Sequence, residues 1–307
     1  MISLSRLGKI TSIIFVMLAI TQPASYTAQC VKPIVEACCL TPLVAFNTLS
    51  LTSLVLLNYC NMSDYLKDEV SYPYVDQLLR DINSALVNEK GVLLPHSIIF
   101  TQEKQLKAFS IPTNHLINYC MPPQQSFGDY YEQKILSGEI SEHVAFDHFQ
   151  YNMLKAIGLH EAHHFTCFQK TKRILRQQLI ASLCLGCASF VIKRSVPMSW
   201  PIFIILHYVT FYYAKKALGA IEMDCDRFSA NSLQSTFYLR LYFDWCEEYE
   251  KKEFDTSPLY KKMFLRLKNF LDVHPSFKQR KEYLDLCARE YNLNSVFSVD
   301  YCGGDAI

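Results

Sequence analysis

The chain has 307 residues, of which half are hydrophobic and 19% are charged, and its formal net charge is +1 at pH 7. A charge so close to zero argues against a nucleic-acid partner, because such partners are held by strongly basic surfaces. The length suits one large domain or two small ones.

The N-terminal region holds two apolar segments. The first, Ile10 to Ile20, follows two basic residues, so residues 1–28 are expected to be a signal peptide or a first membrane segment. The second is a charge-free run from Ala37 to Ser63, which is long enough to cross a bilayer. Residues 29–62 are therefore expected to contain a transmembrane segment.

The remainder, 63–307, is expected to be one metallopeptidase domain, mainly α-helical with a small β-sheet (α+β). Hydrophobic periodicity predicts a helix over 75–87, strands over 92–101 and 105–119, a helix from 141 through 164, and helices over 221–292 interrupted at 257–258 and 274–275.

Residues 177–214 form two apolar stretches joined by a short turn, which predicts an apolar helical hairpin. A spanning or re-entrant hairpin is favoured over a buried one. The buried hairpin remains the alternative, because each arm is shorter than the ~20 residues expected of a spanning helix. Six basic residues flank the hairpin and two lie in its turn: Lys170, Lys172, Arg173, Arg176, Lys215 and Lys216 against Lys193 and Arg194. This bias favours an integral membrane protein whose flanking regions face the cytoplasm.

The twelve cysteines show no recurring zinc-ribbon spacing. Several lie in apolar stretches, where a thiol packs as a small hydrophobic side chain. We therefore expect them to be mainly reduced and structural, as in a body that faces the cytosol.

The segment His160-Glu161-Ala162-His163-His164 fits the pattern H-E-x-x-H. Positions four apart lie on one face of a helix, so His160 and His164 can both offer a ring nitrogen to one metal ion. Glu161 lies about 100° round the helix from His160, where its carboxylate can serve as a general base. The pattern predicts a zinc site with one Zn²⁺ per chain.

A third ligand is expected after the hairpin, at Glu222. Asp226, four residues later, shares its helical face and can hydrogen-bond a ligand histidine. Asp224 lies about 200° from Glu222 and is the alternative if Glu222 does not bind metal. Glu222 and Asp226 could also form an ordinary acidic helix surface with no role in metal binding. Their occurrence together with the His160–His164 motif argues against that alternative.

The order H-E-x-x-H, hydrophobic pair, E-x-x-x-D resembles the membrane zinc metallopeptidases of the HtpX and CAAX prenyl protease family, which are gluzincins. Two further segments strengthen the resemblance. Ala108-Phe109-Ser110-Ile111-Pro112-Thr113-Asn114-His115 is similar to the family's edge strand, and His274-Pro275-Ser276 with Arg280 is similar to its H-P signature. Lys107, Thr113 and Asn114 depart from the family's pattern at the edge strand, and Asp224 and Cys225 depart from it beside Asp226.

The resemblance implies a zincin-like core in which the apolar hairpin is inserted between the two metal-ligand helices. It implies that His274 steadies the oxyanion, that Arg280 orients His274, and that a polypeptide substrate adds as a strand near Ala108, Phe109, Pro112 and His115. The expected reaction is zinc-dependent hydrolysis of peptide bonds in membrane-associated or misfolded proteins, with Glu161 as base. The alternatives are a catalytically silent, metal-binding membrane scaffold and a soluble protease that is exported after signal cleavage.

Overall fold

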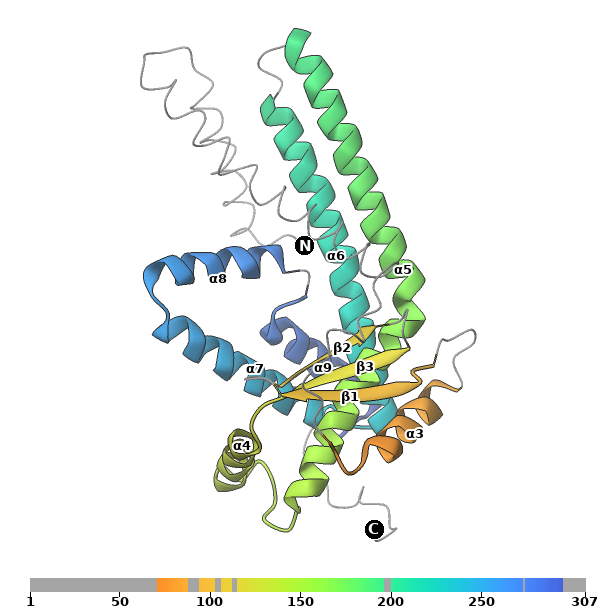
Figure 1. Cartoon of the computed structure of the whole chain (residues 1–307), viewed down its shortest axis with the longest axis vertical. Coiled ribbons are helices and arrows are strands. Elements are labelled where there is room, and N and C mark those ends of the chain that lie inside the picture. Colours follow the sequence, from red (N-terminus) through yellow and green to blue (C-terminus); the bar gives the residue numbers. More distant parts are fainter. Residues whose placement is uncertain are drawn as a thin grey trace. The chain divides into compact units, whose positions relative to one another are not determined.

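A computed structural model describes residues 71–87, 94–102, 106–111, 115–195, 200–272 and 274–294 (Figure 1). The expected signal and transmembrane segments, 1–28 and 29–62, lie outside these ranges, as does Pro112. The described residues are mainly helical with one three-stranded sheet, which confirms the α+β prediction.

The helices are α3 (Val75–Leu86), α4 (Gln124–Leu136), α5 (Phe146–Ser195), α6 (Trp200–Leu233), α7 (Phe237–Thr256), α8 (Leu259–Leu271) and α9 (Phe277–Tyr291). The interruptions expected at 257–258 and 274–275 separate α7 from α8 and α8 from α9. A further break, at Gln234 with φ 51°, separates α6 from α7.

The strands are β1 (Ser97–Gln102), β2 (Lys107–Ile111) and β3 (Leu116–Met121), in the order β1-β3-β2. β3 pairs parallel with β1, where Ser97 faces Leu116, and antiparallel with β2, where Lys107 faces Cys120. The single strand predicted over 105–119 was wrong, because β2 and β3 both fall within that stretch or extend just beyond it. Both strands are apolar, so their hydrophobicity alone gave no sign of the reversal between them.

The chain divides into two compact units. Of the described residues, one unit contains the hairpin arms between Ile174 and Lys215, and the other contains 71–173 and 216–294 with their gaps. The expected metal-site residues described by the structure all belong to the second unit. Among the described residues, which include both arms of the hairpin, no helix combines the length and the apolarity that crossing a membrane requires.

The sheet of the second unit packs on α5, near the start of the H-E-x-x-H motif (Figure 1). Tyr119, at the centre of β3, is fully buried, stacks on Phe100 with ring centroids 5.0 Å apart, and donates its hydroxyl to the Leu154 carbonyl oxygen at 2.8 Å. Gly158 lies in the next turn of α5, and a Cβ there would collide with Tyr119 Oη and with Ile82 Cδ1. The glycine therefore lets the sheet and α3 approach α5 two residues before His160.

Gly158→Ala should lower the free energy of unfolding by about 1–3 kcal/mol, because the added methyl group overpacks this contact. Gly128→Ala in α4 is the matched control. A Cβ there meets no atom within 4 Å, so it should raise stability by up to about 1 kcal/mol through helix propensity. Urea unfolding measures both, and equal behaviour of the two variants would contradict the close approach at Gly158.

Candidate metal centre

The site forms where α5 and α6 run antiparallel (Figure 1). Small residues bring the two helices into contact there. Ala156 of α5 is fully buried, and its carbonyl oxygen accepts a hydrogen bond from Ser229 Oγ of α6 at 2.6 Å. In an antiparallel pair of helices, a residue one turn after such a contact on the first helix lies opposite a residue one turn before the contact on the second helix. His160 therefore meets Asp226, and His164, a turn further, meets Glu222.

Three side chains converge at this point. Glu222 Oε2 lies 3.4 Å from His160 Nε2, and Glu222 Oε1 lies 3.5 Å from His164 Nε2. Neighbouring ligand atoms around a tetrahedral zinc ion, each about 2.0–2.1 Å from the metal, stand about 3.3–3.4 Å apart. Each separation is close to that value, one for each oxygen of the Glu222 carboxylate, so the spacing is compatible with a divalent metal ion between the three side chains.

The burial of the Glu222 carboxylate also supports metal binding. Glu222 is 7% exposed, and its buried Oε2 atom makes no hydrogen bond of good geometry among the described residues, because its contact with His160 Nε2 is long, at 3.4 Å. An ionised oxygen buried without a donor is costly unless a cation satisfies it. A divalent ion between the three side chains would do so.

Glu161 is the other carboxylate within reach. One of its oxygens and nitrogens of His160 and His164 all lie within 4.8 Å of one another. Glu161 is less deeply buried than Glu222. Either carboxylate could therefore complete a metal site with the two histidines. Burial leaves Glu222 few other partners, whereas Glu161 keeps the access to solvent that a general base needs.

Asp226 and Arg280 fix the orientation of His160. Asp226 is fully buried and lies 2.9 Å from His160 Nδ1, and Arg280 holds the same carboxylate through two nitrogen atoms, Nε at 2.7 Å and Nη2. A carboxylate can only accept here, so Nδ1 carries a hydrogen and Nε2 faces Glu222 with its lone pair when the ring is neutral. The guanidinium also lies over the Phe243 ring, 4.2 Å from its centroid.

The structure thus places Arg280 on Asp226, whereas the family resemblance implied that it orients His274. Asp272 orients His274 instead, with its Oδ1 atom 2.6 Å from His274 Nδ1. His274 Nε2 lies 3.5 Å from Glu222 Oε1, and half of the side chain is exposed. An exposed ring that reaches the ligands suits a group that meets substrate.

Cys225 contacts the Nδ1 atom of His164, as Asp226 contacts the Nδ1 atom of His160. Its Sγ atom lies 3.5 Å from His164 Nδ1, so an N–H at Nδ1 can donate to sulfur while Nε2 stays available to a metal. Cys225 also hydrogen-bonds Cys167, one turn after His164 on α5. Sequence reasoning missed this role, although both cysteines follow a metal ligand at a spacing of three residues, a signal that could have found them.

The protonation states follow from these contacts. Burial alone would lower the pKa of His160, but its contacts with the carboxylates of Asp226 and Glu222 outweigh burial and raise the pKa to about 9. Burial lowers the pKa of His164. Burial alone would raise the pKa of Glu222, but the neighbouring His164 and His274 hold it well below its usual range. Before metal binds at neutral pH, His160 is therefore cationic and Glu222 anionic.

The remaining predicted residues lie elsewhere. Ala108 and Phe109 belong to β2, which lies at an edge of the described sheet. His115 precedes β3 with φ 52°, and its Nδ1 atom is 2.9 Å from the Leu94 carbonyl oxygen. Asp224, the alternative ligand, pairs with Arg227 at 3.0 Å, and no described contact joins it to the histidines.

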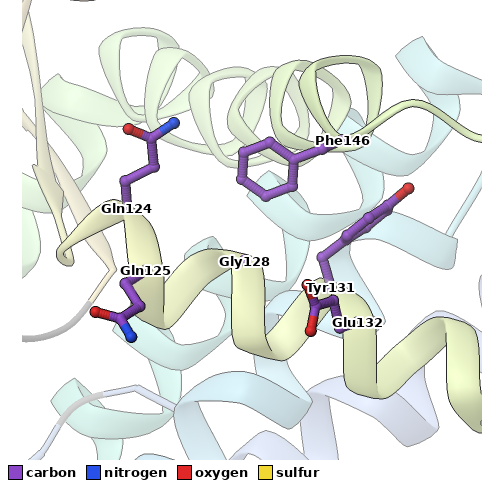
Figure 2. Close-up of a pocket in the computed structure, with 6 residues that line it drawn as sticks. All are labelled: Gln124, Gln125, Gly128, Tyr131, Glu132 and Phe146. Carbon is purple, nitrogen blue, oxygen red and sulfur yellow. The ribbon is translucent and has the colours of Figure 1, made fainter.

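Figure 2 shows a pocket between α4 and the first turn of α5, where the rings of Tyr131 and Phe146 make an edge contact. Phe146 lies fourteen residues before His160 on α5, which is about 21 Å along the helix. The other lining residues are Gln124, Gln125, Gly128 and Glu132. This pocket has no metal-binding group beyond Glu132, so it is separate from the histidine site.

Glu222→Ala should abolish stoichiometric zinc binding, because it removes the buried carboxylate between the two histidines. Asp224→Ala is the matched control, with the same loss of charge two residues away, and should keep the metal. Zinc content after dialysis, measured by atomic emission, distinguishes them. Retention by Glu222→Ala with loss in Asp224→Ala would move the third ligand to Asp224.

Zinc affinity should rise about tenfold per pH unit from neutral pH to about 9, because His160 must release a proton before its Nε2 atom can bind metal. Above that pH the affinity should level off. Asp226→Asn should move the plateau to lower pH, whereas Asp224→Asn should leave it in place. Competition with a chelator of known affinity measures this, and an affinity that does not change with pH over this range would contradict the cationic state.

Comparison of the chain with protein-family models, with curated proteins and with solved structures finds no match.

Proposed function

We propose that this chain is a zinc-dependent endopeptidase with a zincin-like core, in which the apolar hairpin is inserted between the two ligand helices. The observation that carries the proposal is the convergence of Glu222 on the Nε2 atoms of His160 and His164, at 3.4 and 3.5 Å. The proposal includes the resemblance to the HtpX and CAAX prenyl protease family, which rests on the order of the motifs and on the H-P segment.

His160, His164 and Glu222 would hold the ion, leaving a further position for water or substrate. Zinc, when bound there, supplies a Lewis acid that polarises a peptide carbonyl and makes water easier to deprotonate. Asp226 keeps His160 in the tautomer that presents Nε2 to the ion, and Cys225 would accept a hydrogen bond from Nδ1 of His164 in the same tautomer.

Glu161 would perform the proton transfers. Its carboxylate lies beside both histidines, accepts the proton of the attacking water and returns it to the leaving amine. No metal-bonding task competes for this carboxylate if Glu222 is the third ligand.

His274 would stabilise the negative charge that develops on the substrate carbonyl oxygen. Burial alone would lower the pKa of its imidazole, but Glu222 and Asp272 raise it. A protonated ring with Nδ1–H bonded to Asp272 presents Nε2–H as a donor beside the ligands. An extended peptide could add to the edge strand β2, as the family resemblance implies.

The cellular setting stays a prediction. Several large apolar side chains of the hairpin are exposed, among them Leu183, Ile202 and Tyr213 at 61%, 60% and 65%. Such an apolar surface is compatible with contact to a bilayer, and the flanking basic residues favour a cytoplasmic site. Carbonate extraction of membranes separates this setting from export, since a soluble exported protease would be released.

Glu161→Gln should retain zinc and reduce hydrolysis of an unfolded protein such as casein by on the order of a hundredfold or more. Glu142→Gln, at an exposed position, makes the same substitution away from the site and should keep full activity. Proteolysis assays of detergent-purified protein, with zinc content measured in parallel, provide the comparison.

Full cleavage by Glu161→Gln would remove Glu161 as the base. Zinc-loaded wild-type protein that cleaves no peptide bond would instead favour the catalytically silent scaffold of the same fold.

A further inference from the structure

α8 is amphipathic, and three residues of its apolar side, in its first two turns, are exposed. With about 100° per residue, its large apolar residues occupy one arc of roughly 140°, at Leu259, Tyr260, Met263, Phe264, Leu267, Phe270 and Leu271. The opposite side carries the charged residues and a lone leucine, at Lys261, Lys262, Leu265, Arg266, Lys268 and Asn269.

The exposure of this helix is the reverse of what a surface helix normally shows. Leu259, Tyr260 and Met263, which share the apolar arc, are 77%, 76% and 64% exposed. On the other side, Lys262 and Leu265 are partly buried. A surface helix of a globular protein turns its apolar arc toward the core, so this arc needs a partner from outside the described residues.

Contacts with α7 explain why the charged side faces the protein. Lys262 Nζ and Arg266 Cζ lie over the Phe254 ring, 5.5 and 5.6 Å from its centroid, and Lys261 forms an ion pair with Glu253 at 3.1 Å. These interactions with the end of α7 fix the rotation of α8 about its axis. The outward direction of Leu259, Tyr260 and Met263 therefore follows from these contacts.

The charge of α8 indicates what covers the arc. The helix contains Lys261, Lys262, Arg266 and Lys268 and no acidic residue. Lys261 lies by one edge of the arc and Arg266 by the other, at about 200° and 340°. Both side chains remain exposed although they contact α7. An apolar arc bordered by cations matches a membrane surface, where apolar side chains enter the acyl region and the cations meet lipid phosphates and carboxylates.

We propose that α8 binds the surface of an anionic lipid bilayer, with Leu259, Tyr260 and Met263 inserted. The helix leads through Asp272 to His274 of the metal centre, so lipid binding would bring this side of the site to the bilayer. The proposal does not depend on peptidase activity, because it rests on the exposure and charge of α8 alone.

Amide hydrogen exchange of the full-length protein tests whether α8 binds lipid. Exchange is measured at residues 259–271 only, so that lipid contacts of other apolar segments do not affect the result. Exchange in α8 should slow at least about tenfold with vesicles of phosphatidylcholine and phosphatidylserine, and much less with phosphatidylcholine alone. High salt should reverse part of the protection, because the charges are screened.

A double variant, Leu259→Ser with Met263→Ser, should lose the protection of the remaining α8 amides. The control is Val87→Ser with Leu136→Ser, which removes apolar side chains that are 69% and 87% exposed on other helices and should behave as wild type. Exchange in α8 that vesicles of either composition leave unchanged would overturn the proposal, as would full protection in the α8 variant. The first result would point to a protein as the partner of the arc.

Discussion

The buried carboxylate of Asp226 is the group on which the proposed metal centre depends. It is fully buried, it is held by two nitrogens of Arg280, and it contacts His160 Nδ1. Removing one partner of a buried ion pair commonly costs about 3–5 kcal/mol, because the other charge is left uncompensated. The pair therefore ties α9 to α6 and, through His160, to α5. Metal geometry and local stability share these contacts.

A second constraint is the close approach of α5 to its neighbours, which small residues allow on two sides. Gly158 admits Tyr119 and Ile82, and Ala156 admits Ser229 of α6. Because these positions lie within one turn of His160, the packing of the sheet and of α6 determines where the imidazole lies. The ligands are thus placed by rigid helices packed in a core, which favours a site whose geometry exists before metal binds.

Local spacing carried most of what the sequence could predict. Helical periodicity grouped His160 with His164 and Glu222 with Asp226 correctly, because residues four apart share a face whatever the fold. The same reasoning failed for the pairing of Arg280 with Asp226, which are 54 residues apart, and for the orientation of His274 by Asp272. It also divided α5 into a motif helix and a hairpin arm, although α5 continues from Phe146 to Ser195. No residue that breaks helices lies between the two parts. The change in hydrophobicity along the chain therefore reflects a different environment around each part of α5, and it does not mark the end of a helix.

X-ray absorption spectroscopy of the zinc-loaded protein tests the central claim most directly, because it identifies the atoms bound to the ion. The account predicts scattering from two imidazoles and from oxygen, with metal distances of about 2.0–2.1 Å. Cys225 lies next to His164, so a sulfur ligand at about 2.3 Å is the main alternative. A zinc–sulfur shell, or a spectrum without imidazole scattering, would contradict the assignment of His160, His164 and Glu222.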